Sequence, residues 1–305
     1  DTDRVFILRT VEDTLRIHKF IAENDVKSAV IAGGGYIGLE MAENLTEKGI
    51  SVTIVQRPNQ VMAPLDYDMA CQLHGLLRKK GITLKFGSSV TGFEEKDGLI
   101  LTTLKDDEPL KSDLVILAIG VTPDTALAKD AGLALGIKGS ITVNERMETS
   151  APDVYAVGDA VQVKNFVTGE DALISLAGPA NKQGRIAADN ICGLKSSYDG
   201  SQGSSVIKIF DMTAATTGIN EKTAKQLGID YDKVVLFPLS HAGYYPGALA
   251  MSMKVIYEKK TLRLLGAQIV GYEGVDKRSD VIATVIRLGA VSYTHLRAHE
   301  TDSYL

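Results

Sequence analysis

The sequence has 305 residues, of which 45% are hydrophobic and 23% are charged, and its formal net charge at pH 7 is −5. These values favour a soluble α/β protein of two domains with enough chain for a sizeable core. The slightly acidic balance does not indicate binding to nucleic acid or to an anionic membrane surface. No apolar run approaches the roughly 20 residues that span a bilayer, and the chain does not begin with a secretory signal pattern, so we expect a cytoplasmic protein.

The two cysteines, Cys71 and Cys192, are far apart and form no Cys-x-x-Cys pair. A metal site or a disulfide framework is therefore not indicated, and we expect both cysteines to be small buried or half-buried side chains. His295 and His299 have a four-residue spacing, but residues 291–305 resemble a translated sequencing-library adaptor. We therefore assign no metal ligands, expect this segment to be an artefact outside the fold, and expect the chain to be an internal piece of a longer protein.

The first predicted elements lead into a buried strand. Residues 1–8 form a connector with an apolar run, and residues 11–24 have apolar side chains at roughly helical spacing. Residues 28–32, Ser-Ala-Val-Ile-Ala, are short, β-branched and apolar, which is typical of a strand covered on both faces.

A Gly-x-Gly-x-x-Gly pattern follows this strand, with glycines at Gly33, Gly35 and Gly38, and it precedes a predicted helix at residues 39–48 and a second strand at residues 51–55. In this setting Gly33 makes the tight turn, Gly35 lets a pyrophosphate approach the backbone, and Gly38 lets the helix pack closely on the sheet. The helix N-terminus attracts the phosphates. The alternative is a glycine-rich turn without a ligand, which the strand–turn–helix–strand context disfavours.

One position departs from the dinucleotide-binding pattern. An acidic residue usually ends the second strand and holds the ribose hydroxyls, but here the strand ends at Gln56 and Arg57. Gln56 could still hydrogen-bond a ribose, and Arg57 could accept a 2′-phosphate. The sequence therefore predicts a nicotinamide dinucleotide and leaves the choice between NADH and NADPH open.

The remaining elements of this domain are, in order, a helix, a strand, an antiparallel hairpin and a fully apolar strand: residues 66–80, 82–86, 90–104 and 114–119. We expect Met69, Leu73, Leu76 and Leu77 to face inward. The hairpin turns at Asp-Gly, a pair that favours a tight turn. Residues 24–119 thus predict a Rossmann-like nucleotide-binding domain.

A second signal lies at residues 149–160, where an apolar strand is predicted directly before Gly158 and Asp159. A carboxylate at the carboxyl end of a strand can hold a ribose or ribitol hydroxyl. The alternative is that Asp159 only caps the following turn. Next, Gly-Pro at residues 178–179 precedes a predicted helix at residues 180–191, whose N-terminal dipole could face an anionic ring edge.

Together these segments resemble the pyridine nucleotide-disulfide oxidoreductase family of two-dinucleotide flavoproteins. The similarity rests on a connector, a nicotinamide fingerprint, a return crossing and a second flavin motif, at residues 6–14, 33–40, 118–123 and 149–159. It implies an α/β fold in which an NAD(P)-binding domain (24–119) is inserted in a partial FAD-binding domain (1–23 and 120–200), followed by an α+β dimerisation domain (201–290).

The resemblance also implies residue roles. Asp159 would bind the flavin ribitol, Tyr36 would lie beside the flavin where nicotinamide must stack, and Glu40 would point toward that place. The other cofactor-binding positions that it implies, beside the three glycines, are Ile37, Gln56, Arg57, Gly120, Gly158 and Ala177. Ordinary packing is the alternative role for Tyr36.

Within the family, residues 176–185 and 241–248 are most similar to coenzyme A disulfide reductases, their persulfide-reducing relatives and NADH oxidases. In that group Tyr244 and Tyr245 would reach the active site of the partner subunit of a homodimer. There a tyrosine hydroxyl could donate a proton to a sulfur leaving group or steady it. Asn181 and Arg185 could face the substrate. Interface packing is an equally weighted alternative for the tyrosine pair.

The family's redox-active cysteine and first FAD fingerprint precede the connector, so we expect neither in this chain. The implied parent enzyme uses FAD and NAD(P)H and passes hydride through the flavin to a cysteine sulfur. It would reduce a coenzyme A disulfide or a persulfide. An NADH oxidase or peroxidase is the competing assignment, and a nucleotide-binding module without a redox role is a third. We expect the fragment to bind a dinucleotide weakly and to have no turnover alone.

Overall fold

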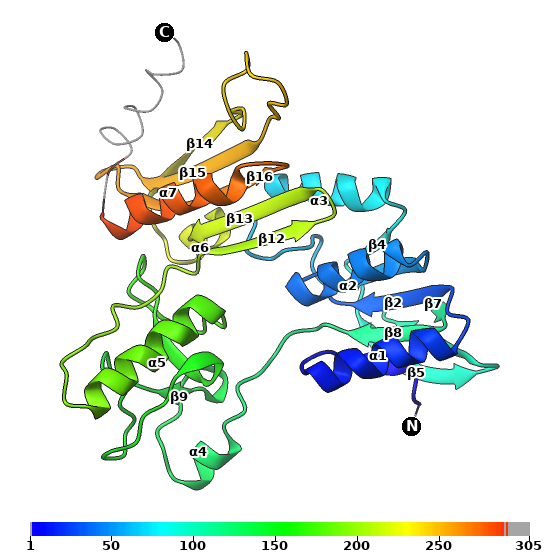
Figure 1. Ribbon diagram of the computed structural model, residues 1–305, viewed down its shortest axis with the longest axis horizontal. Helices are drawn as coiled ribbons and strands as arrows, with labels where there is room; N and C mark the ends of the chain where they lie inside the picture. Colours follow the sequence, from blue (N-terminus) through cyan, green and yellow to red (C-terminus); the bar gives the residue numbers. More distant parts are fainter. Residues whose placement is uncertain (1, 290, 292–305) are drawn as a thin grey trace. The chain divides into compact units, whose positions relative to one another are not determined.

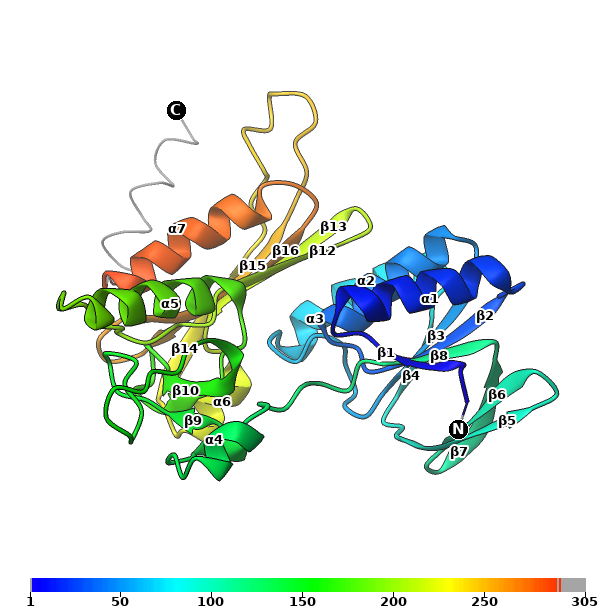
Figure 2. The ribbon, with the colours of Figure 1, turned by 60° about the horizontal axis from the view of Figure 1, so that its bottom comes forward.

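A computed structural model describes residues 2–289 and 291 (Figures 1 and 2). The chain divides into two compact units: residues 1–120 with 207–213, and residues 121–206 with the chain from residue 214 onward. The predicted artefact at residues 291–305 falls outside the described residues except for Val291. No helix among the described residues has the length and apolar character needed to cross a membrane.

The first unit is built on a five-stranded parallel sheet in the order β1-β8-β2-β3-β4. Its strands are β1 (Val5–Ile7), β2 (Ser28–Ala32), β3 (Ser51–Gln56), β4 (Thr83–Phe86) and β8 (Leu114–Leu117). Every strand predicted for this sheet is confirmed, and the predicted connector contains one more, β1, at the edge. The central β2 is buried over four of its five residues, which explains its unbroken apolar sequence.

Helices α1 (Val11–Glu23) and α2 (Tyr36–Glu47) cover one face of this sheet in Figure 2. The other face carries an antiparallel sheet of β5 (Val90–Lys96), β6 (Leu99–Leu104) and β7 (Asp107–Ser112). Ile100 and Leu104 of β6 join Val30, Val55 and Val115 of the parallel sheet in one buried cluster. The predicted hairpin is therefore confirmed.

The helix α3 (Tyr67–Lys79) buries the four side chains expected to face inward, Met69, Leu73, Leu76 and Leu77. The prediction that both cysteines are buried or half-buried is wrong. Cys71 lies on the exposed face of α3, and Cys192 is the exposed C-cap of α5 (Ala177–Ile191). Residue type favours an inward position for a small apolar side chain, but the register of α3 turns Cys71 to solvent, and Cys192 lies just past the end of α5.

The second unit begins with a small sheet of β9 (Ile141–Thr142), β10 (Val161–Lys164) and β11 (Asp171–Ala172), accompanied by α4 (Ala126–Asp130) and α5. The strand predicted before Gly158 does not form, because only Tyr155 makes a bridge, to Glu148. Val154 and Val157 are 40% and 39% exposed. An extended segment becomes a strand only beside a hydrogen-bonding neighbour, and the described residues offer this one a single bridge.

A five-stranded sheet in the order β12-β13-β16-β15-β14 follows in the chain. Its strands are β12 (Ser205–Ile209), β13 (Met212–Gly218), β14 (Tyr231–Leu236), β15 (Ser252–Glu258) and β16 (Leu264–Gly271). The central β16 is buried along its whole length. Helix α7 (Val275–Arg287) packs on β16 with Val275, Ile282 and Ile286. Together with α6 (Glu221–Gln226) and α7, this sheet gives the region the mixed α and β composition that the resemblance implies.

A buried ionic cluster ties α6 to the β14–β15 pair. The Glu221 carboxylate accepts hydrogen bonds from Tyr231 Oη at 2.7 Å and Lys233 Nζ at 2.6 Å, and it also pairs with Lys254. Lys254 is only 1% exposed. Burial alone would raise the pKa of Glu221, but the hydrogen bonds from Lys233, Lys254 and Tyr231 lower it to about 2. The cluster therefore keeps Glu221 charged in the folded chain.

We expect Glu221→Gln to lower the free energy of unfolding by about 3 kcal/mol, because it removes a carboxylate partner from a buried lysine. Lys254→Met is the matched control. It removes the buried cation, leaves Glu221 with Lys233 and Tyr231, and should cost clearly less. In the Lys254→Met background, Glu221→Gln should lose most of its effect, as measured by urea denaturation. Equal losses in both backgrounds would contradict the coupling.

A loop after β3, residues 57–65, is held by two side chains. Gln60 Nε2 donates to the Leu65 carbonyl at 2.8 Å, and the Val61 N–H donates to His74 Nε2 at 3.3 Å. His74 lies in α3 and is 3% exposed. Burial, with a smaller contribution from Arg78, lowers the pKa of His74 to about 4. The neutral ring can therefore keep its acceptor nitrogen through most of the weakly acidic range.

The depressed pKa of His74 predicts an acid-sensitive loop. Because the folded chain resists protonation and the unfolded chain does not, stability should be complete above about pH 6.5 and decline toward pH 4, by at most about 3 kcal/mol. His74→Gln keeps an acceptor without a titrating ring and should flatten this decline. Denaturant titrations at several pH values test this. A wild-type curve that is flat between pH 6.5 and 4 would contradict it.

Candidate functional site

The glycine turn after β2 approaches the end of β8 so closely that one position excludes a side chain. Gly33 has φ +113°, and its N–H donates to the Val55 carbonyl at 2.8 Å. A Cβ built on Gly33 would lie 2.2 Å from the Ala118 carbonyl oxygen. Only glycine therefore allows the chain to turn from β2 between its neighbouring strands.

The third glycine serves helix packing. A Cβ on Gly38, in the first turn of α2, would lie 2.0 Å from the Gly33 carbonyl oxygen and 3.4 Å from Ile31 Cγ2. The helix thus sits directly on the turn that precedes it. Gly34 is confined as well, because its Cβ would meet Val61 Cγ1 at 2.7 Å and its carbonyl accepts the Met62 N–H at 2.8 Å. These contacts clamp the turn from two sides.

Gly35 is different because no atom lies within 4 Å of its built Cβ position, and its φ of −86° is ordinary. Nothing in the first unit requires a glycine there. Gly35 is the N-cap of α2 and supplies no side-chain cap to the first turn of that helix. An open approach to backbone N–H groups at the positive end of a helix dipole fits a pyrophosphate. The residues present therefore fit the dinucleotide phosphates.

Gln56 ends β3 beside this turn and uses both ends of its amide within the first unit. Its Oε1 accepts the Gly34 N–H at 3.0 Å, and its Nε2 donates to the Gln60 carbonyl at 3.2 Å. Arg57 follows and is exposed. Gln56 thus links the glycine turn to the loop at residues 57–65, a role that its neighbours in sequence did not predict.

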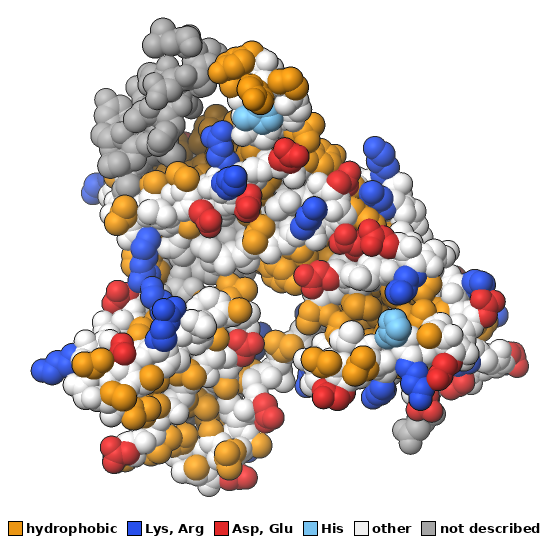
Figure 3. Space-filling view, viewed as in Figure 1, with side chains coloured by type: hydrophobic (Ala, Val, Ile, Leu, Met, Phe, Trp, Pro, Cys, Tyr) orange, Lys and Arg blue, Asp and Glu red, His pale blue; other side chains and the backbone are white. Residues whose placement is uncertain are grey.

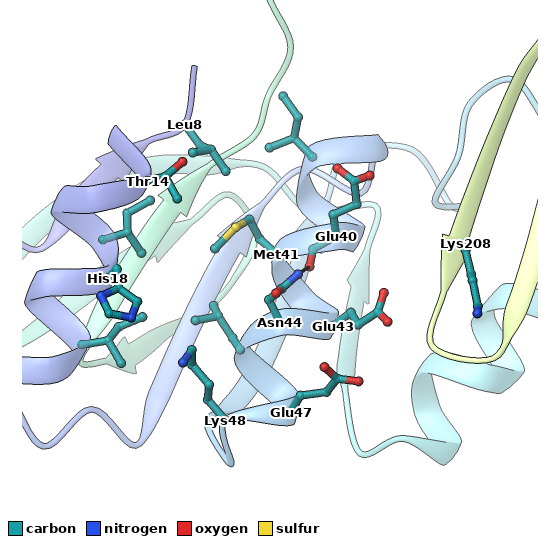
Figure 4. Close-up of a pocket in the computed structure, with 14 residues that line it drawn as sticks. Leu8, Thr14, His18, Glu40, Met41, Glu43, Asn44, Glu47, Lys48 and Lys208 are labelled. Carbon is teal, nitrogen blue, oxygen red and sulfur yellow. Dashed lines mark hydrogen bonds between the residues drawn. The ribbon is translucent and has the colours of Figure 1, made fainter. Parts of the chain in front are cut away.

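Tyr36, Ile37 and Glu40 follow the turn on α2. Tyr36 is half-buried, while Ile37 and Glu40 are exposed. Ile37 and Glu40 line a groove of about 580 Å³ whose labelled side chains come mainly from α1 and α2 (Figure 4). Met41 extends from α2 toward the α1 side of the groove in that view. The structure thus gathers the predicted nicotinamide-side residues on the first turns of one helix.

The flavin-side residues lie in the second unit, except for Gly120, which ends the first unit with φ +107° and is exposed. Gly158 has φ +83°, and its N–H donates to Oε1 of the buried Gln183 at 2.7 Å. Asp159 is exposed, and no hydrogen bond or ion pair links its side chain to another described residue. This does not support the alternative that Asp159 serves as a turn cap. Gln183, which anchors the turn to α5, was not identified from the sequence.

The N-terminal part of α5 carries the other predicted positions of this unit. Ala177 is its first residue and is exposed, and no side chain caps this helix start. Asn181 and Arg185 lie one turn apart on the exposed face, where the Arg185 guanidinium donates to Asn181 Oδ1 at 3.1 Å. The helix therefore presents uncapped N–H groups and a polar pair close together in sequence.

The tyrosine pair lies in the loop between β14 and β15. Tyr244 and Tyr245 are 90% and 67% exposed. The loop is closed at its base by hydrogen bonds between Ser240 and Leu249, and His241 Nε2 lies 3.3 Å from the Pro246 carbonyl oxygen. Hydrophobic side chains gather on the surface of this loop in Figure 3. Such apolar exposure is typical of an interaction surface.

Comparison with known proteins gives two family matches. The model of the pyridine nucleotide-disulphide oxidoreductase family matches residues 1–184, and the model of its dimerisation domain matches residues 204–298. A curated relative from Methanocaldococcus jannaschii, named NADH oxidase, is 37% identical over 290 residues, which cover 94% of this chain and 63% of the relative. The chain therefore spans less than two thirds of that relative's length.

Solved structures agree with these matches. The reduced Bacillus anthracis protein CoADR-RHD is 48% identical with a TM-score of 0.92, and the match covers 94% of this chain and 52% of that one. An NAD-dependent persulfide reductase from A. fulgidus is 36% identical with a TM-score of 0.92, covering 95% of this chain and 54% of that one. With the glycine turn and both matched domains in place, this chain belongs to the pyridine nucleotide-disulphide oxidoreductase family.

Proposed function

We propose that this chain is the nicotinamide-binding and dimerisation part of an FAD-dependent NAD(P)H oxidoreductase that reduces a coenzyme A disulfide or a persulfide through a cysteine sulfur. The observation that carries the proposal is the glycine turn, in which Gly33 and Gly38 satisfy packing while Gly35 is left open in front of an uncapped helix. The persulfide reductase from A. fulgidus and the B. anthracis protein support the substrate class.

On this proposal the first unit binds and orients the nicotinamide coenzyme, whose chemistry with the flavin is hydride transfer. The N–H groups at the start of α2 hold the pyrophosphate against Gly35. Tyr36 would lie where the nicotinamide stacks, and Glu40, one turn further on the same helix, would point toward that place. Because Tyr36 is half-buried, its side chain would shield the flavin ring from water until the coenzyme enters.

The residues that would hold FAD are Gly120, which ends the first unit, and Gly158, Asp159 and Ala177 of the second unit. The exposed Asp159 carboxylate would accept a hydrogen bond from a ribitol hydroxyl, because no hydrogen bond or ion pair to another described residue occupies it. The start of α5 at Ala177 presents backbone N–H groups to an electron-rich ring edge. The residues present therefore fit the part of the flavin that this chain would contact.

The substrate would meet residues of both subunits of a homodimer. Asn181 and Arg185 face the thiol or disulfide substrate from α5. Tyr244 or Tyr245 of the partner subunit donates a proton to the sulfur that leaves when the disulfide or persulfide bond breaks. The apolar side chains that β14 and its loop expose, Val234, Val235, Phe237 and Leu249, support the dimer.

We keep the domain boundaries as part of the proposal: residues 24–119 bind NAD(P), residues 1–23 and 120–200 belong to the FAD-binding domain, and residues 201–290 form the dimerisation domain. The protein acts in the cytoplasm.

A second candidate, an NADH oxidase or peroxidase, is favoured by the name of the M. jannaschii relative. The two differ in the electron acceptor and share every residue role assigned here to coenzyme binding.

The experiment that separates them uses a chain extended upstream of Asp1 and loaded with FAD. NADH and NADPH consumption is measured with coenzyme A disulfide, with a persulfide, and with oxygen alone. Rapid consumption that depends on the sulfur acceptor supports the reductase. Rapid consumption with oxygen alone overturns it in favour of the oxidase. The 305-residue chain, tested in parallel with FAD, should show coenzyme binding without turnover.

Substitutions in the glycine turn should affect coenzyme affinity and the free energy of unfolding separately. Gly35→Ala places a methyl group in the open approach and should weaken coenzyme affinity at least about tenfold, while the free energy of unfolding changes by less than about 1 kcal/mol. Gly38→Ala forces a clash with the Gly33 carbonyl and should destabilise the first unit by more than about 2 kcal/mol. Calorimetric titration and denaturant unfolding measure the two effects.

Gly75→Ala is the matched control, because Gly75 lies in α3, is exposed, and has no atom within 4 Å of its built Cβ. This change should leave coenzyme affinity unaltered and stabilise the helix by about 0.5–1 kcal/mol. Unchanged coenzyme affinity in a folded Gly35→Ala variant would contradict the proposed binding site.

A further inference from the structure

The edge of the proposed coenzyme site that would face the adenosine ribose lacks negative charge. In a strand–helix–strand dinucleotide site, an acidic residue at the end of the second strand accepts the ribose 2′-hydroxyl, and an arginine nearby accommodates a 2′-phosphate instead. Here β3 ends at Gln56, and residues 56–60 read Gln-Arg-Pro-Asn-Gln, with no acidic residue. Nothing in this segment repels a phosphate.

Gln56 is required as an amide because it donates and accepts at once. Its Oε1 accepts the Gly34 N–H, and its Nε2 donates to the Gln60 carbonyl. A carboxylate in the same place could accept the first hydrogen bond, but it would set a negative charge against the Gln60 carbonyl oxygen. The two hydrogen bonds that join the glycine turn to the loop therefore favour glutamine over glutamate at position 56. The absence of negative charge at this edge of the coenzyme site follows from that preference.

Arg57 supplies positive charge at this edge. It follows the last residue of β3 directly and is exposed. None of the hydrogen bonds or ion pairs found among the described residues involves its guanidinium group. A guanidinium group binds phosphate through two parallel charge-assisted hydrogen bonds, and one that is free of a carboxylate gives up no existing pair to do so.

We propose that Arg57 binds the adenosine 2′-phosphate, so that the glycine-turn site takes NADPH in preference to NADH, while Gln56 is a positioning residue that braces the turn. This rests on the proposed function, because it requires that a nicotinamide coenzyme bind at the turn. It adds which coenzyme is preferred and which side chain selects it.

The test is calorimetric titration of the 305-residue chain with NADPH, NADH, 2′,5′-ADP and 5′-ADP. NADPH should bind at least about tenfold more tightly than NADH, and 2′,5′-ADP should exceed 5′-ADP by a similar factor. Arg57→Ala should remove this preference by weakening NADPH and 2′,5′-ADP alone, and Arg57→Lys should restore part of it. Added salt should weaken the binding of NADPH more than the binding of NADH.

Lys96→Ala is the charge-matched control. Lys96 is an exposed cation at the end of β5 in the same unit, and its removal should leave all four affinities within about twofold. To test the positioning role of Gln56, Gln56→Glu should lower the melting temperature and weaken the binding of NADPH. Gln56→Met, which lacks both hydrogen-bonding groups, should lower the melting temperature while retaining a preference for NADPH over NADH.

The outcomes separate the two proposals. Equal affinities, tighter NADH, or an Arg57→Ala effect that is the same for both coenzymes overturns the 2′-phosphate assignment and leaves the dinucleotide site intact. An unaltered melting temperature in both Gln56 variants overturns the brace. If neither coenzyme binds the wild-type chain, the proposed function fails, and this inference fails with it.

Discussion

Close approach of backbone to backbone at the glycine turn is the constraint on which the first unit depends. Gly33 lies against the Ala118 carbonyl at the end of β8, and Gly38 lies against the carbonyl of Gly33 itself. One strand end, one turn and one helix start therefore meet at a point with no room for a methyl group. Gly35, between them, is the position whose side-chain space faces outward, so the packing that excludes side chains also exposes the helix N-terminus.

A second set of contacts keeps this turn in place. His74 of α3 holds Val61, Val61 covers Gly34, and Gln56 joins Gly34 to Gln60. Each link is a single hydrogen bond or van der Waals contact, so none is strong alone, but together they connect α3 to the start of α2. This series of contacts requires the neutral form of His74, so the geometry of the turn depends on pH.

Most of the fold could be predicted because its signals are local. Glycine spacing, apolar runs and an Asp-Gly turn each act within a few residues, and they located the β2–α2–β3 unit and the hairpin. The failed strand depends on distant neighbours, because the segment at Val154 lacks the pairing partners that would make it a strand. The failure at Cys71 is local, because the helical register that turns Met69 and Leu73 to the core turns Cys71 to solvent. The role of Gln56 as a brace became visible only when Gly34 and Gln60 were seen on either side of it.

The central claim is that the backbone at Gly34 to Leu39 binds a nicotinamide dinucleotide. Amide hydrogen exchange of the 305-residue chain, compared with and without saturating NADPH, tests it most directly. We expect slower exchange at the first turn of α2 and at the Gln56–Gln60 loop, with no change at the distant β5–β6 hairpin turn, Asp97 and Gly98. Unchanged exchange at the glycine turn, or protection confined to other segments, would contradict it.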